Sequence, residues 1–559
     1  MPRTPARTPA RTPARTPART HARRVPATPA VPGARAVPGP GASVAVGAAA
    51  FLIYALLCPS VAADKDSGEF TLVLATLGLA HPTGYPLYTL IGHPFAVALH
   101  ALGMTWPRAA NTFSALGGGV AVGALHALVT RLWPARAGAR AASALALLPV
   151  GAFLLDPVWT FETTLAEINS WHVAWAAVAA LVAWHADRAL EDPRTPARAV
   201  RRQAFGWGLV LGAGVAHHAT FVFPAAPFTL LLLVRLAARA RDRASALLAG
   251  IAGTLVPAAS IAYVAWRATH PALVQWPELG PRPGDVLDHL GGAQYRQFLG
   301  HFTPSPAQAA LLVRYVYPWL VPGAAAACAA PFLTLPGTRG YRLALAAATL
   351  AQTVACFAYG VPDPSSYFLP PLLFGFALLG PVLAALVSGR AVARTAVAAA
   401  ALGVAALAVQ GARVAVQRNA TYAQLDTLLR RMWDSLPDAP GFVVWSDDMN
   451  TRLRIYQLLE GDRAALEVVH PAHLTHPLPR LRFAQRHGFD PVAGLDPLLA
   501  GRAIQAGDTL RARALEDGIV DRLNRATPLP VYRFLPEVPS VRRLRKPDAV
   551  RTPGPSSPG

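Results

Sequence analysis

The sequence predicts a polytopic α-helical membrane protein with a small C-terminal α/β domain outside the membrane. Of its 559 residues, 53% are apolar and only 14% are charged. In soluble domains about a quarter of all residues are charged. Several apolar stretches reach roughly 20 residues, the length at which a helix crosses a bilayer. Arginines gather between these stretches, where basic residues orient a membrane protein.

The first forty residues are of low complexity. The tetrapeptide Arg3-Thr4-Pro5-Ala6 recurs along residues 1–40, and a proline at every fourth position blocks helix and sheet. Because almost nothing apolar is available to bury, we expect a disordered segment. Its eight arginines and lack of acids, directly before the first apolar stretch, predict a cytoplasmic N-terminus.

Residues 41–410 form the predicted transmembrane domain. Twelve apolar stretches are candidate spans: 41–63, 85–102, 111–131, 140–159, 168–186, 205–220, 221–238, 244–266, 309–333, 341–361, 367–388 and 391–409.

The arginines between these stretches select eleven spans. If all twelve stretches crossed, sixteen arginines of five inter-span clusters would lie outside the cell, against the positive-inside rule. The stretch from Tyr85 to Leu102 is short and is interrupted by Pro86, His93 and Pro94. We therefore expect it to lie on the periplasmic surface as a juxtamembrane helix.

This topology gathers the acids at the outer face. Ten of the fourteen acidic residues between Gly41 and Gln410 then lie there, in or beside outer loops such as 64–108 and 268–308. Ionisable groups collected at one membrane face suggest a functional site at that face.

The character of the chain changes near residue 411. Phe442 to Trp445 and Leu466 to Val469 are typical of buried strands, and Asn450 to Leu459 is typical of a helix. With an odd number of spans, this α/β domain of residues 411–540 is expected in the periplasm. The basic and then Pro/Ser/Gly-rich tail of residues 541–559 is expected to be disordered.

The densest polar cluster is Asp64-Lys65-Asp66-Ser67-Gly68-Glu69, directly after the first span. On a helix, Asp66 and Glu69 share a face, and two carboxylates can divide the roles of general base and substrate orientation. Such carboxylates could also hold a divalent cation, although no cofactor is identified. The alternative is a solvated loop in which Asp66 or Ser67 caps the next helix.

A rigid turn follows in His81-Pro82-Thr83-Gly84-Tyr85-Pro86. Its two prolines and one glycine restrict the backbone, so His81 and Tyr85 could be held toward a ligand. The alternative is an ordinary loop that enters a helix.

Five matches in chain order resemble one known family. They are Asp66 to Tyr88, Pro157 to Trp159 with Ala166 to Ser170, Gly212 to His218, Gln275 to Pro277 with Ala293 to Arg296, and Val361 to Asp363 with Tyr367 to Pro370. The family is the GT-C-fold membrane glycosyltransferases, once a domain of unknown function, that include the animal transmembrane O-mannosyltransferase of plexin-type receptors. The resemblance covers roughly residues 41–370.

This resemblance implies an inverting glycosyltransferase. Such an enzyme moves a sugar, mannose or another hexose, from a polyprenyl-phosphate carrier to a hydroxyl acceptor, a protein Ser/Thr or a glycan, outside the membrane. A base must deprotonate the acceptor, and something must stabilise the departing phosphate. We expect Asp66 to be the base and Glu69 to position the sugar or the acceptor.

Further residues are expected to bind substrate. Arg296 and Arg314 could neutralise the phosphate in bidentate fashion, although Arg314 could instead snorkel to the interface. Glu167, His217 and His218 lie at outer ends of spans and could line the pocket, although such histidines are often core residues. The remaining candidates are Asp64, His81, Tyr85, Tyr295, Asp363 and Tyr367.

Two other classes of function remain open: a multi-pass transporter and a non-catalytic protein that binds the lipid carrier. A transporter would show inverted repeats, and we find none. Nucleic acid is not an expected partner, since no basic stripe alternates with aromatics. We expect the chain in the cytoplasmic membrane of a bacterium, with the lipid bilayer, the lipid-linked sugar and a periplasmic acceptor as its partners.

The eleven-span topology makes a direct prediction. Alkaline phosphatase fused after Val409 should be active, because that point is expected outside the cytoplasm. An inactive fusion, beside a cytoplasmic reporter that is active at the same point, would contradict this topology.

Overall fold

The computed structural model describes residues 40–63, 66–133, 139–239, 241–276, 278–300, 302–361, 363–386, 390–445, 449–495, 509–535 and 540–543. All of them belong to one compact unit that begins at Val37. The predicted disorder of residues 1–40 and 541–559 falls mostly outside the described residues, as does the candidate residue Asp64. Where the two overlap the prediction is wrong: Pro40 begins a helix, and residues 541–543 belong to a strand, because they pair with the strand of residues 531–535.

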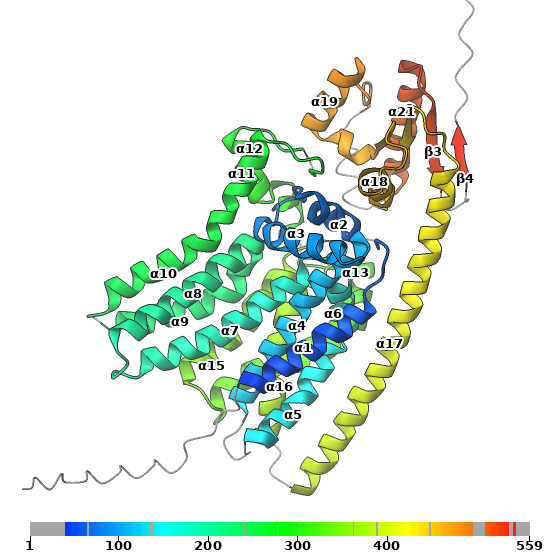
Figure 1. Cartoon of the computed structure of the whole chain (residues 1–559). Helices are drawn as coiled ribbons and strands as arrows, with labels where there is room; N and C mark the ends of the chain where they lie inside the picture. The colour runs from blue at the N-terminus through cyan, green and yellow to red at the C-terminus, as the bar shows by residue number, and fades with distance from the viewer. Residues whose placement is uncertain are drawn as a thin grey trace, which may run out of the picture. The chain divides into compact units, whose positions relative to one another are not determined.

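Helices make up most of the described chain (Figure 1). Up to the large outer loop they are α1 (Pro40–Leu57), α2 (Ser67–Thr76), α3 (Pro86–Ala101), α4 (Trp106–Leu132), α5 (Ala139–Leu154), α6 (Pro157–Thr164), α7 (Asn169–Glu191), α8 (Ala197–His217), η1 (Ala219–Phe221), α9 (Val222–Ala237), α10 (Arg243–Ala258), η2 (Ala259–Ile261) and α11 (Ala262–Thr269). From that loop onward they are α12 (Pro283–Leu290), η3 (Ala293–Phe298), α13 (Pro306–Leu311), η4 (Leu312–Val316), α14 (Tyr317–Ala329), η5 (Ala330–Phe332), α15 (Arg339–Phe357), η6 (Ser365–Phe368), α16 (Leu369–Leu386), α17 (Arg390–Asp434), α18 (Asn450–Leu459), η7 (Pro471–Thr475), α19 (Pro477–His487) and α21 (Thr509–Ala526).

The chain is a multi-pass membrane protein. Among the described residues, eight helices are long and apolar enough to cross a bilayer, and the pair α5 and α6, bent by 74°, would be a ninth. Each of the eleven predicted spans coincides with a helix. However, α8 and α15 do not meet the same criterion, and both begin with arginines. The count of eleven therefore stays a prediction.

The stretch expected to lie along the surface is helix α3. It has 16 residues, contains Pro94 and is absent from the candidate spans of the described chain. It packs on α2 and α4, and Figure 1 shows α2 and α3 together at one end of the long helices. The side of the membrane on which this end lies stays a prediction.

Glycines let α8 and α10 pack backbone against backbone. A Cβ atom at Gly208 would lie 2.0 Å from the Gly250 carbonyl oxygen, and one at Gly253 would lie 2.3 Å from the Phe205 carbonyl oxygen. Small residues at membrane helix interfaces allow this close approach. The glycine-rich part of α8 is thus a packing surface.

The C-terminal residues form a four-stranded sheet with the order β2-β1-β3-β4. The strands are β1 (Gly441–Val444), β2 (Leu466–Val469), β3 (Val531–Leu535) and β4 (Ser540–Arg543). β1 pairs in parallel with β2 and β3, while β3 and β4 are antiparallel. The bounds of α18 and β2 are those that the sequence predicts, and β1 starts one residue earlier.

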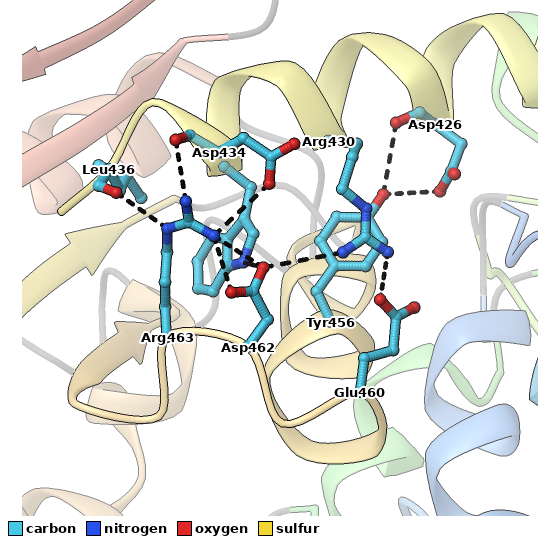
Figure 2. A network of polar contacts seen from close by, with 9 residues as sticks. Asp426, Arg430, Asp434, Leu436, Tyr456, Glu460, Asp462 and Arg463 are labelled. Carbon is cyan, nitrogen blue, oxygen red and sulfur yellow. Dashed lines mark hydrogen bonds and ion pairs between the residues drawn. The ribbon is translucent and has the colours of Figure 1, made fainter. Parts of the chain in front are cut away.

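Helix α17 continues without a break from the long helices to this sheet, so residue 410 lies inside a helix. Figure 2 shows how its end is fastened to α18 and to the loop that precedes β2. Arg430 lies 3.5 Å from the centroid of the Tyr456 ring, whose hydroxyl donates to Asp426 at 2.6 Å. Arg463 donates to the Leu436 carbonyl oxygen at 2.9 Å. These contacts fix the sheet to the end of α17.

The tight contact between α8 and α10 yields a stability prediction. We expect Gly208→Ala to destabilise the protein by about 1–3 kcal/mol, the usual cost of overpacking, because its methyl group has no space. Gly206 is the matched control, because a Cβ atom there meets nothing within 4 Å. Melting of the purified protein measures both variants, and equal melting temperatures would contradict the packing.

Candidate functional site

The two predicted catalytic carboxylates lie on the first turn of α2. Asp66 occupies the N-cap position, and its backbone oxygen accepts from the Phe70 amide at 2.8 Å. The Asp66 side chain does not cap the helix, has no hydrogen bond within the described chain and is 52% exposed. The Asp66 carboxylate therefore does not cap α2, which was one of the alternatives that the sequence left open.

Glu69 holds the turn that follows α2. Its Oε1 atom accepts from the backbone amide of His81 at 2.7 Å, and its Oε2 atom lies 3.0 Å from His81 Nδ1. The other ring nitrogen, Nε2, lies 3.0 Å from the Tyr85 hydroxyl and 3.9 Å from Asp66 Oδ2. His81 therefore links the two carboxylates and Tyr85, residues that the sequence singled out from two separate motifs.

The charge of His81 follows from this environment. Burial alone would lower the pKa of the imidazole, but the Glu69 and Asp66 carboxylates outweigh it and raise the pKa of His81 from 6.5 to about 9. Near neutral pH the ring is therefore a cation between two anions. It satisfies Glu69 and leaves the more exposed Asp66 facing outward.

Aromatic rings surround this cluster. Tyr85 stacks on His218 with ring centroids 5.6 Å apart, and Tyr295 meets His81 edge-on at 6.4 Å. Burial raises the pKa of the Tyr85 and Tyr295 hydroxyls, and the Asp66 charge raises it further. Both phenols therefore stay protonated and can donate hydrogen bonds, but they are poor bases.

Glu167 and His217 support the loop between α6 and α7. The Glu167 amide donates to Ser114 Oγ at 3.0 Å, and a ring nitrogen of His217 lies 3.0 Å from the Ile168 carbonyl oxygen. Both side chains are almost fully buried. The ring centroid of His217 also lies 6.0 Å from that of Tyr88. Because Tyr88 belongs to α3, His217 contacts this helix as well.

Of the other predicted binding residues, Tyr367 lies close enough to Asp66 and Tyr295 to interact with both electrostatically, whereas Arg296 and Arg314 lie on the surface. Asp363 accepts hydrogen bonds from Ser365 at the start of η6, and Tyr367 meets Tyr359 edge-on at 5.1 Å. Arg296 is 66% exposed and pairs loosely with Asp288 at 3.8 Å. Arg314 is exposed over the ring of its neighbour Tyr315.

Asp66, Glu69 and His81 also offer a cation site in donor type and spacing. One ligand atom from each lies within 4.8 Å of the others. An imidazole with two carboxylates suits a divalent transition metal such as zinc. Glu69 and His81 would have to exchange their mutual bonds for such an ion.

A polar cavity of about 370 Å³ opens beside the two carboxylates. Asp66, Glu69 and Leu72 at α2 form one wall, and residues 271–276 with Glu278 of the outer loop form another. The remaining lining comes from α18, β2, η7 and α19. The site predicted in the first outer loop therefore extends onto the C-terminal residues.

The comparisons with known proteins agree with this arrangement. Residues 66–242 match the family described as "Protein O-mannosyl-transferase TMEM260 N-terminal domain". Mouse protein O-mannosyl-transferase TMEM260 is 36% identical over 131 residues, which are 23% of this chain and 17% of that protein. The crystal structure of ArnT from Cupriavidus metallidurans bound to undecaprenyl phosphate superposes with a TM-score of 0.50 at 14% identity, over 88% of this chain and 92% of ArnT.

The chain has the GT-C fold, and its residues 66–242 are similar to the TMEM260 N-terminal domain. The resemblance to GT-C membrane glycosyltransferases is thus confirmed. The TMEM260 match begins at Asp66 and includes the carboxylate pair, the His81 turn and the His217-His218 pair.

Sequence reasoning missed the contribution of the C-terminal residues to this GT-C site. Arg454, His470 and His473 line the cavity, yet no motif marks them: Arg454 lies on α18, and the two histidines lie at the start of η7 and within it. One available signal was Gly68, where a Cβ atom would lie 2.0 Å from Thr451 Oγ1. A glycine between two carboxylates on a helix indicates that another part of the chain approaches closely.

The Glu69–His81 pair makes a pH-dependent prediction. His81 should titrate near pH 9, and Glu69→Gln should lower its pKa by about one unit or more, because the nearest anion is lost. Since the raised pKa favours the folded state, this stabilisation is complete below pH 6.5 and is lost as pH rises through 9. Histidine NMR in the presence of a chelator measures the pKa, and titration of His81 near 6.5 would contradict the pairing.

Proposed function

We propose that the protein is an inverting glycosyltransferase that moves a sugar from a polyprenyl-phosphate carrier to a hydroxyl group of a protein. The sugar is mannose or another hexose, and the acceptor is a Ser or Thr on the extracytoplasmic side. The GT-C fold and the TMEM260-type domain support the transferase class. The observation that carries the assignment is an exposed Asp66 carboxylate, free of hydrogen bonds in the described chain, at the mouth of a polar cavity.

In this mechanism Asp66 is the general base. The acceptor hydroxyl gives its proton to the Asp66 carboxylate while its oxygen forms a bond to the anomeric carbon. The bond from that carbon to the carrier phosphate breaks, and its electron pair leaves with the phosphate. Attack opposite the leaving group inverts the anomeric centre. Asp66 is suited to this role because Glu69 is occupied by His81, and because Tyr85 and Tyr295 keep their protons.

Glu69 is, in this proposal, a positioning residue. It accepts both hydrogen bonds of His81, and so it sets the place of the imidazolium and of Tyr85. The imidazolium lies 3.9 Å from the Asp66 carboxylate. A divalent cation held by Asp66, Glu69 and His81 would supply positive charge for the departing phosphate. Arg296 and Arg314 remain candidates for the same neutralising role.

The long helices suit a lipid-linked donor. Large apolar side chains of α9 and α10, such as Leu230, Leu248 and Leu255, are more than half exposed, as expected for faces that contact acyl chains. The proposed place is the cytoplasmic membrane of a bacterium, with the carboxylate pair facing the periplasm. Polyprenyl chains then stay in the bilayer while the sugar reaches α2.

The test is sugar transfer by purified protein from polyprenyl-phosphate-mannose to peptides that contain Ser or Thr. Asp66→Asn keeps the size of the side chain but removes the base, so transfer should fall by about 10²–10⁴-fold. Glu69→Gln should also reduce transfer, through the position of His81. Assays with and without a chelator show whether a cation contributes.

Surface Glu191 on α7 provides the control, because Glu191→Gln removes a half-exposed carboxylate far along the chain from the site. Transfer by Asp66→Asn at the wild-type rate would move the base elsewhere. If the wild-type protein neither transfers nor hydrolyses any lipid-linked sugar, the proposed function is wrong.

A further inference from the structure

The cavity beside Asp66 and Glu69 lies outside the candidate spans. Its lining comes from α2, from residues 271–276 with Glu278 and from residues 450–486, and none of these belongs to the helices of the described chain that could cross a bilayer. Its lining includes four carboxylates, three arginines and two histidines. Such a lining suits a polar occupant better than the polyprenyl chain of the donor.

Arginines dominate the wall that faces the carboxylates. Arg482 pairs with Glu278 of the outer loop, and Arg486 lies 3.0 Å from Glu467. Within each pair the positive and negative charges neutralise each other. Arg454 is the third arginine of this wall, and among the described residues no hydrogen bond or ion pair within 4 Å holds it. The Glu467 carboxylate attracts it from a distance but is already shared by Arg486 and His487.

Leaving the Arg454 guanidinium without a hydrogen-bonded anion at this position is unfavourable in free energy. Arg454 is partly buried, and burial lowers its pKa, because its charge is incompletely solvated. Buried charged side chains in proteins normally form an ion pair with a group of opposite charge. A ligand that brings a planar carboxylate to Arg454 would accept two of its five N–H donors in bidentate geometry and would neutralise its charge.

Arg454 and Asp66 belong to one packed arrangement. Thr451, one helical turn before Arg454, lies against Gly68 between the two carboxylates. Ile455 joins Ala62 and Leu72 in a shared apolar cluster. Since α18 is packed directly on α2, the spacing between the proposed base and the guanidinium is fixed by the fold.

We propose that this cavity is the acceptor site and that Arg454 binds a carboxylate of the acceptor, a polypeptide whose Ser or Thr has an Asp or Glu close by. The hydroxyl lies at Asp66, and the carboxylate lies at the opposite, basic wall. Trp276 and His473 beside it supply ring surfaces for the intervening peptide. This inference rests on the proposed function, whose acceptor it defines.

The experiment measures initial rates with the full-length protein, polyprenyl-phosphate-mannose and three synthetic peptides. The peptides are identical except that Glu, Gln or Lys lies two residues from the only Thr. The wild-type protein should have a KM for the Glu peptide that is about tenfold lower than for the Gln peptide, as a charge-assisted pair provides. Arg454→Gln should raise the KM for the Glu peptide about tenfold and leave that for the Gln peptide unchanged.

Three controls separate this role from a structural one. Arg454→Lys should retain part of the preference for Glu, and Arg454→Glu should favour the Lys peptide. Arg282→Gln removes an exposed arginine that does not line the cavity and should change nothing. Hydrolysis of the donor in the absence of peptide, and the donor KM, should be the same in every variant.

Each contrary result has a distinct meaning. Transfer that ignores the peptide charge, or an Arg454→Gln effect on the donor KM, would overturn the acceptor site while the proposed transferase stands. Donor hydrolysis without transfer to any peptide would also overturn it, and would point to a glycan acceptor. Neither hydrolysis nor transfer by the wild-type protein would overturn the proposed function itself.

Discussion

The arrangement of the site depends on the two hydrogen bonds between Glu69 and His81. They join the first turn of α2 to the rigid turn that leads into α3, and both partners are largely buried. A buried carboxylate needs such partners, because an unpaired charge away from water is strongly disfavoured. With Glu69 satisfied in this way, Asp66 is the carboxylate of the pair that keeps no hydrogen bond among the described residues. Asp66 and Glu69 thus differ in exposure and hydrogen bonding because their neighbours differ.

The sequence predicts much of the helical part because its signals are local. Residues 85–102 give α3, and the spacing of Asp66 and Glu69 places them on one helical turn. Interspersed arginines identify inter-span segments, yet the same arginines lower the hydropathy of α8 and α15, so composition alone does not settle the number of spans.

What the sequence could not predict depends on contacts between distant segments. Arg454 lies almost 400 residues after Asp66, and no periodicity relates the two. Their proximity arises because Gly68 leaves space for Thr451 and because α17 runs unbroken to the sheet. Composition changes near residue 411, but a helix can continue through such a change when its exposed face simply passes from lipid to water.

The unbroken helix α17 has a mechanical consequence. Its 45 residues correspond to a rod about 67 Å long, of which a bilayer covers roughly 30 Å. The contacts of Arg430 and Arg463 attach the sheet to the far end of this rod. Any change in tilt imposed by membrane thickness is therefore amplified at the basic wall of the cavity. The thickness of the bilayer is thereby linked, through a single helix, to the position of the sheet and of the cavity wall that it carries.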